Sequence, residues 1–159
     1  MLKLISKLVG SKSDRDLKKL QPYVESVNAF DAALKTMSND QLRERTVAFK
    51  ASIAEATAET KASKDALYTE IDATPDYDAR EPLYEEIEAL DAQELELIEG
   101  VLSAIHPEAF GVMRETARRF NAGDVRATAT ALDRELAKNH AHITLEGDEV
   151  IYSNSWKAA

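Results

Sequence analysis

A dense group of carboxylates is one candidate for catalysis or metal binding in this sequence. They crowd residues 84–88 and 94–96, in the segment Tyr84-Glu85-Glu86-Ile87-Glu88 and in Glu94-Leu95-Glu96. A hard-cation site needs six or more oxygens converging on one point, usually from a loop with a glycine at its sharp turn. This stretch holds no such loop, so its pattern indicates a solvated acidic helix face.

Histidines and arginines form two further candidate groups. His140 and His142 would share one face of a strand and offer two metal ligands, but only His106 remains as a third histidine and there is no cysteine. The arginine cluster consists of Arg114, Arg118 and Arg119 and could contact phosphates. No aromatic side chains that could stack on bases accompany it, and the chain is acidic overall, which disfavours nucleic-acid binding. We therefore predict no catalytic, cofactor-binding or metal-ligating residue, and no specific nucleic-acid partner.

The basic amino terminus is the strongest candidate for a binding surface. Residues 1–20 carry six basic and two acidic side chains, whereas residues 54–99 carry fifteen acidic and three basic ones. An amphipathic helix can bury its apolar face at the lipid headgroup boundary while its lysines meet anionic lipid. The predicted membrane- or partner-binding residues are Leu2, Lys3, Ile5, Lys7, Leu8, Lys12, Arg15, Lys18 and Lys19. The alternative is that the apolar side chains pack on the rest of the protein and the lysines are solvated.

Composition is typical of a mainly helical, water-soluble chain. Of 159 residues 44% are hydrophobic, 31% are charged and 6% are aromatic, and the net charge is −9. No apolar run approaches the length of a membrane span, and Lys3 and Lys7 interrupt the apolar start before it could serve as a secretory signal. The expected location is the cytoplasm.

Helix signals divide the first half of the chain. Gly10 suggests a hinge before a second helix that begins near Ser13, and a further helix is expected after Pro22. Ser38 and Gln41 have the spacing of a capping box for the next helix, which could extend into the alanine-rich residues 54–66.

Residues 61–102 predict an antiparallel helical hairpin. Residues 74–78 and Pro82 break the helical pattern, and a heptad-like repeat then resumes, with Glu94 as its one polar member; the repeat consists of Leu83, Ile87, Leu90, Leu97 and Val101. Two helices joined by a short turn should pack against each other.

The remaining segments predict one more helix and a β-hairpin. Pro107 suits a first helical position, and the helix that follows has Phe110, Met113, Ala117 and Phe120 along one face. Residues 125–131 are ambiguous between strand and helix, and residues 132–136 suggest a short helix. Residues 142–152 alternate apolar and polar around Gly147 as a β-hairpin does, and that hairpin must lean on residues 107–120 or on a part beyond residue 159.

Three segments, in order, resemble SecA, the ATP-driven motor of bacterial protein secretion. Residues 107–119 are similar to the family block PEAFAVVREASKR, residues 37–50 are similar to LSDEELKGKTAEFR, and residues 1–19 look like the opening amphipathic helix. Residues 54–99 and 121–159 look like two insertions of the kind found in the Bacteroidetes branch of that family.

The resemblance implies an organisation and a role. It implies a basic amphipathic helix over 1–20, a helical segment over 21–60, the acidic hairpin over 61–102, a motor-domain helix over 103–123 and an insertion with a β-hairpin over 124–159. These would belong to the first nucleotide-binding, RecA-like domain of a larger motor. The implied partners of residues 1–20 are anionic membrane on the inner face of the plasma membrane, the translocation channel and the ribosome; the downstream remainder of the motor is another partner, and a homodimer is left open.

The family's ATP and Mg sites are expected to lie outside this sequence. A phosphate-binding loop needs closely spaced glycines and a lysine, whereas the five glycines here are scattered and no Gly-Lys-Ser/Thr triplet occurs. We expect the chain to end before that loop and to be inactive as an ATPase on its own. The alternative is a stand-alone helical interaction module without ATPase function, and whether the reading frame continues into a phosphate-binding loop distinguishes the two.

Overall fold

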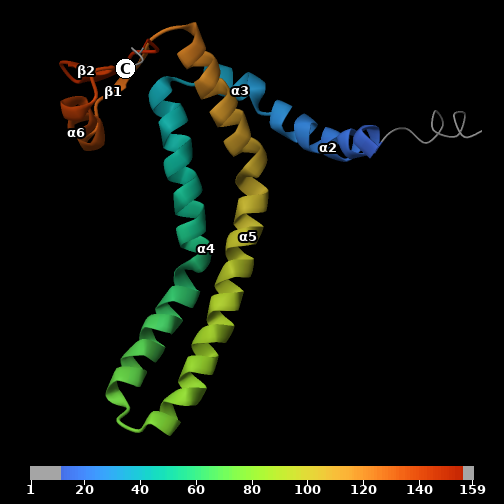
Figure 1. Ribbon diagram of the computed structural model, residues 1–159, viewed down its shortest axis with the longest axis vertical. Coiled ribbons are helices and arrows are strands. Elements are labelled where there is room, and N and C mark those ends of the chain that lie inside the picture. Colours follow the sequence, from blue (N-terminus) through green and yellow to red (C-terminus); the bar gives the residue numbers. More distant parts are fainter. Residues whose placement is uncertain (1–11, 156–159) are drawn as a thin grey trace, which may run out of the picture. The chain divides into compact units, whose positions relative to one another are not determined.

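The computed structural model describes residues 12–155 and is mainly helical, as predicted (Figure 1). Its described part divides into two compact units, residues 46–106 and residues 12–45 with 107–155. The elements in chain order are α2 (Lys12–Asn28), α3 (Asp31–Thr36), α4 (Asn39–Ala73), α5 (Tyr77–Ala122), β1 (Val125–Thr128), α6 (Ala131–Asn139), β2 (Ile143–Glu146) and β3 (Glu149–Tyr152).

The unit of residues 46–106 is an antiparallel hairpin of α4 and α5. The sequence predicted such a hairpin over the shorter range of residues 61–102. The two arms run side by side from the connection at residues 74–76 (Figure 1). Near this turn the seam is apolar: buried Leu67 and Ile71 meet buried Ile87, and Leu83 and Leu90 pack against them. These residues recur every three or four positions on both helices, which is the spacing of a coiled-coil seam.

A polar layer follows the apolar part of the seam. Glu94, the polar member of the predicted repeat, pairs with Lys64 of the opposite helix, and Lys64 Nζ also lies 2.7 Å from an Asp91 carboxylate oxygen. Thr57 and Thr60 are buried further along α4, where the Thr57 hydroxyl donates to the Ile53 carbonyl at 3.0 Å. The acidic residue therefore has a partner in the seam, and the interruption in the repeat does not end the hairpin.

Three prolines predicted to mark helix boundaries lie inside helices instead. Pro22 is within α2, and Pro82 and Pro107 are within α5. The prediction that a new helix begins at Pro107 is therefore wrong. Each proline removes one main-chain hydrogen bond, but neighbouring contacts hold the helix: Leu83 joins the apolar seam beside Pro82, and Glu108 beside Pro107 pairs with Arg45.

The other unit begins with α2, α3 and the first turns of α4. α2 includes Ser13, which confirms that a helix is present where one was predicted. Ser38 and Gln41 form the predicted capping box: Gln41 N donates to Ser38 Oγ at 3.1 Å, and Ser38 N donates to Gln41 Oε1 at 2.8 Å. Both hydrogen bonds satisfy main-chain N–H groups that the first turn of a helix leaves unpaired.

The carboxy-terminal part of this unit is a small antiparallel sheet covered by α6. The strand order is β1-β3-β2, so the predicted hairpin of β2 and β3 gains a third strand from the ambiguous residues 125–128. Ala127, Ile143 and Val150 form its core, against which Leu136 and Ala137 of α6 pack. Gly147 has φ +61° in the two-residue turn between β2 and β3, a conformation that glycine adopts without strain.

A helix that crosses a bilayer needs about 20 consecutive, mostly apolar residues. No helix within residues 12–155 combines the length and the apolar character of a membrane-crossing segment.

Candidate docking segment and its anchoring network

The predicted docking residues fall into two groups. Leu2, Lys3, Ile5, Lys7 and Leu8 lie outside the described residues. The other four, Lys12, Arg15, Lys18 and Lys19, lie on α2, where all are exposed. None of these four makes an ion pair with the part of the chain that the structure describes, so their charge is available at the surface.

An apolar stripe on α2 was missed by the sequence analysis. Leu17, Leu20 and Val24 follow helical spacing, and they are 62%, 58% and 48% exposed. No residue of α2 is buried. The expected helix boundary at Pro22 hid this pattern, because it placed Leu20 and Val24 on different helices. One continuous helix instead carries both the basic side chains and the stripe.

The end of α2 is held against α5 by close packing and by an arginine. Gly111 is buried, and a Cβ atom there would lie 2.8 Å from Leu34 Cδ1 and 3.8 Å from the Val27 carbonyl oxygen. Arg114 donates to Asn28 Oδ1 at 2.7 Å and also pairs with Asp31. Contact with α5 is thus concentrated at the last turn of α2 and at α3.

The apolar face predicted for the last part of α5 is only partly the face that packs, because Phe120 meets Tyr152 but other members are exposed. Phe110 and Met113 are 52% and 70% exposed, whereas Gly111, Val112 and Glu115 are buried. Sequence periodicity pointed to the large apolar side chains; it could not show that a glycine and a carboxylate provide the contact surface.

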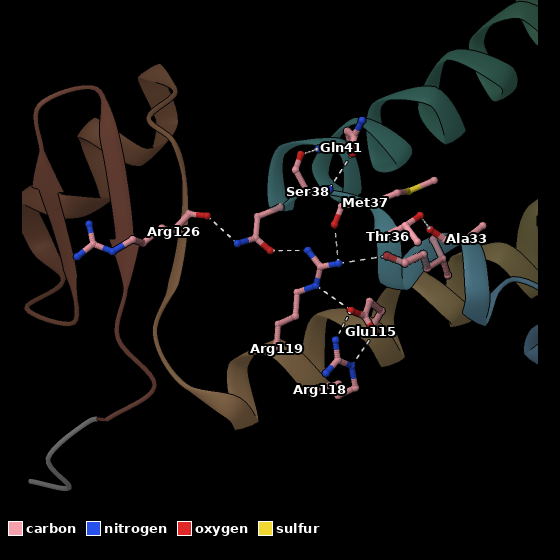
Figure 2. A network of polar contacts seen from close by, with 11 residues as sticks. Ala33, Thr36, Met37, Ser38, Gln41, Glu115, Arg118, Arg119 and Arg126 are labelled. Atoms are coloured by element: carbon pink, nitrogen blue, oxygen red, sulfur yellow. Dashed lines mark hydrogen bonds and ion pairs between the residues drawn. The ribbon is translucent and has the colours of Figure 1, made fainter.

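Arg119 of α5 contacts both α3 and the start of α4 (Figure 2). Its guanidinium donates to the carbonyls of Leu34 and Met37 at 3.1 and 2.7 Å, and to Asn39 Oδ1 at 2.7 Å. Its Nε donates to Glu115 at 2.8 Å. The Leu34 carbonyl also accepts from the Met37 N–H at 3.2 Å, so Arg119 is its second donor. The guanidinium also places a cation at the carboxyl end of α3, where the helix dipole is negative.

Glu115 is the acceptor at the centre of this network. Arg118 and Arg119 both donate to its carboxylate, at distances of 2.7 to 2.8 Å. Hydrogen bonds from Arg118, and then those from Arg119, lower the pKa of Glu115 to about 2 against the opposing effect of burial. The carboxylate is therefore ionised throughout the physiological range.

Side chains of the first turns of α4 form hydrogen bonds with the outer edge of β1. Asn39 Nδ2 donates to the Arg126 carbonyl at 2.7 Å, and Arg43 donates to the Thr128 carbonyl at 2.9 Å. Asp40 accepts from the main-chain N–H and from the hydroxyl of Thr128, at 2.9 and 2.8 Å. These bonds occupy main-chain groups that an edge strand would otherwise present to solvent.

A second buried carboxylate holds the sheet and α6 in place. Asp133 is 1% exposed; it caps α6 through Thr130 and accepts from Arg43 at 2.7 Å and from the Tyr152 hydroxyl. Burial by itself would raise the pKa of Asp133, but hydrogen bonds from Tyr152, Thr130 and Arg43 hold it well below its usual range. Tyr152 also meets Phe120 edge to face, with ring centroids 6.3 Å apart, so the sheet leans on the helix that sequence analysis named.

The arginines and histidines that the sequence analysis considered as possible ligand-binding residues contact other side chains of the protein. All three arginines of the cluster pair with protein carboxylates, at Asp31 and Glu115. The rings of His140 and His142 lie 5.6 Å apart. Across residues 12–155 there is no grouping of three or more histidine, aspartate or glutamate side chains with the geometry of a metal site.

These features define a mainly helical segment with a long antiparallel hairpin and a small sheet, and the comparisons place it in a family. Residues 5–124 match the model of the SecA DEAD-like domain. The chain belongs to the SecA family.

Its relatives are translocase subunits of Bacteroidetes, as the resemblance implied. The chain is 40% identical to the protein translocase subunit SecA of Flavobacterium psychrophilum and 41% identical to that of Christiangramia forsetii, in each case over 98% of this chain. It is 38% identical to the SecA of Porphyromonas gingivalis over 97% of its length. It spans only 14% of the length of these relatives. No solved structure matches the chain.

Proposed function

We propose that this chain is the amino-terminal part of a protein-export motor and that residues 1–20 dock it to the inner face of the bacterial plasma membrane. The translocation channel and the ribosome are further partners that residues 1–20 would contact. In this proposal the chain works with a downstream remainder, which supplies the ATP and Mg sites and the ATPase activity. Its relatives are translocase subunits about seven times longer than the part that this chain covers, which supports that arrangement.

The exposed basic and apolar surface of α2 carries the docking proposal. Lys12, Arg15, Lys18 and Lys19 accompany the stripe of Leu17, Leu20 and Val24 on a helix without buried residues. Each basic residue near an anionic membrane contributes about 1 kcal/mol, over a range of about 8 Å at physiological salt. Apolar side chains that leave water completely add about 1.5–3 kcal/mol each. Binding should thus be weak, reversible and salt-dependent.

Vesicle binding tests this function. The intact chain should sediment with vesicles rich in anionic phospholipid, should bind neutral vesicles little, and should be released as salt rises. Deletion of residues 1–20 should abolish the binding while circular dichroism of the remaining helices persists, because the part of α2 within this range buries no side chain.

A charge-matched pair of variants separates docking from general electrostatics. Lys18→Gln with Lys19→Gln should weaken binding by up to about thirtyfold, since each lost charge is worth about 1 kcal/mol. Lys50→Gln with Lys138→Gln removes the same charge from exposed positions on α4 and α6 and should leave binding unchanged. Equal binding by the intact and truncated chains would show that the amino-terminal segment is a structural strut.

A further inference from the structure

Two tyrosines on the α4–α5 hairpin are exposed without a structural role. Tyr68 on α4 is 50% exposed and Tyr84 on α5 is 52% exposed. Within residues 12–155 neither hydroxyl makes a hydrogen bond. Tyrosine is enriched in protein interfaces because it offers a large apolar ring with a polar tip, so an unused pair on a solvated helix face points to a contact.

Both tyrosines lie on the same side of the hairpin. Tyr68 follows Leu67 and Tyr84 follows Leu83, and both leucines belong to the seam. One residue onward turns each helix by about 100° in the same right-handed sense. Because the two helices face each other and run in opposite directions, that rotation brings both tyrosines to one side of the seam.

Carboxylates flank both tyrosines in the same arrangement. Asp65 and Asp72 lie three residues before and four residues after Tyr68, and Glu81 and Glu88 have the same spacing around Tyr84. Side chains three and four residues apart share a helix face. All four carboxylates are exposed, and none makes an ion pair in the described part of the chain. Each ring is therefore bordered by two carboxylates that lack a cation.

This combination suits a guanidinium or an ammonium group. A cation is attracted to the face of an aromatic ring, and an adjacent carboxylate can accept its hydrogen bonds. A cation–π contact is present near the turn of the hairpin, where the guanidinium carbon of Arg80 lies 5.0 Å from the ring centroid of Tyr77.

We propose that this tyrosine–carboxylate face, formed by Asp65, Tyr68, Asp72, Glu81, Tyr84 and Glu88, binds an arginine- and lysine-rich segment of a partner protein. Charge complementarity selects the occupant, since residues 54–99 hold fifteen acidic and three basic side chains. The same excess repels nucleic acid and anionic lipid. The face shares no residue with residues 1–20, so the two proposals stand or fall independently.

Calorimetric titration of the full 159-residue chain tests this. The probe is a short peptide of alternating arginine and serine, and the same peptide with glutamine for arginine is the uncharged control. Tyr68→Ser with Tyr84→Ser should weaken binding by about tenfold, as expected for two exposed cation–π contacts. Tyr68→Phe with Tyr84→Phe keeps the rings and should bind within about twofold of the parent.

Charge-matched variants complete the test. Neutralising Asp65, Asp72, Glu81 and Glu88 to their amides should abolish measurable binding. Neutralising Glu55, Glu59, Glu96 and Glu99, which are also exposed and without ion pairs in the described chain, should have a much smaller effect. Circular dichroism verifies that every variant remains helical.

Three results would overturn the proposal. The first is that both sets of amide substitutions weaken peptide binding equally, which would mean that bulk charge alone drives it. The second is that the variant with both tyrosines changed to serine binds the peptide as well as the parent does. The third is that the glutamine peptide binds. Sedimentation equilibrium adds a fourth: a dimer that the serine variant dissociates would assign the face to a second copy of this chain instead.

Discussion

Arg119 lies one helical turn after Glu115 on α5 and donates from its Nε to the Glu115 carboxylate at 2.8 Å. The same guanidinium holds the carbonyls of Leu34 and Met37. One side chain thus ties the α3–α4 connection to α5.

Arg119→Met should lower the free energy of unfolding by about 3 kcal/mol. It leaves a buried carboxylate with one fewer cation, removes the donor to the Met37 carbonyl and leaves the Leu34 carbonyl with the Met37 N–H alone. Urea titration followed by circular dichroism measures this. Arg118→Met, which removes a mostly exposed side chain from the same carboxylate, should cost clearly less. Equal losses from the two variants would mean that the carbonyl contacts contribute nothing.

Stability should fall in acid because of Glu115. Its pKa of about 2 in the folded chain lies below the ordinary value of 4.5, so the folded state favours the ionised form. This contribution is fully present above about pH 5 and is lost as pH falls towards 2; it amounts to at most about 3 kcal/mol. The unfolding free energy of Glu115→Gln should be lower at pH 7 and should change less between pH 5 and 3. Parallel pH profiles for the two proteins would contradict this assignment, since Asp133 contributes equally to both.

Two glycines of α5 should respond oppositely to alanine. A Cβ at Gly100 meets no atom within 4 Å, whereas a Cβ at Gly111 would lie 2.8 Å from the buried Leu34 side chain. Gly100→Ala should therefore raise the free energy of unfolding by about 0.5–1 kcal/mol through helix propensity. At Gly111 that gain is offset by overpacking of about 1–3 kcal/mol, so a net loss is expected. Thermal unfolding of both variants measures the difference, and stabilisation by Gly111→Ala would show that α3 can shift.

Periodicity and capping chemistry predicted much of this fold, and tertiary contacts account for most of what they missed. The Ser38–Gln41 capping box, the hairpin repeat and the turn at Gly147 depend on neighbours within a few residues. The helix start predicted at Pro107 was wrong, since α5 continues through it. The ion pair of Arg45 with the next residue, Glu108, joins residues far apart in the sequence. The Arg43–Asp133 pair joins residues 90 positions apart, and no local pattern could reveal it. The docking role assigned to residues 1–20 remains a prediction.

Loss of Asp133 should unfold the sheet and α6 locally. Asp133→Ala leaves the Arg43 guanidinium, the Tyr152 hydroxyl and the first turn of α6 without their shared acceptor, which should cost about 3 kcal/mol. Because the core of the sheet consists of a few small apolar side chains, we expect this loss to exceed its local stability. Amide hydrogen exchange should accelerate at least tenfold in β1, β2, β3 and α6 while the α4–α5 hairpin keeps its protection. Asp148→Asn, at a fully exposed carboxylate, is the matched control and should change neither region. Uniform acceleration across the chain would instead mean that the sheet and the hairpin unfold as one cooperative unit.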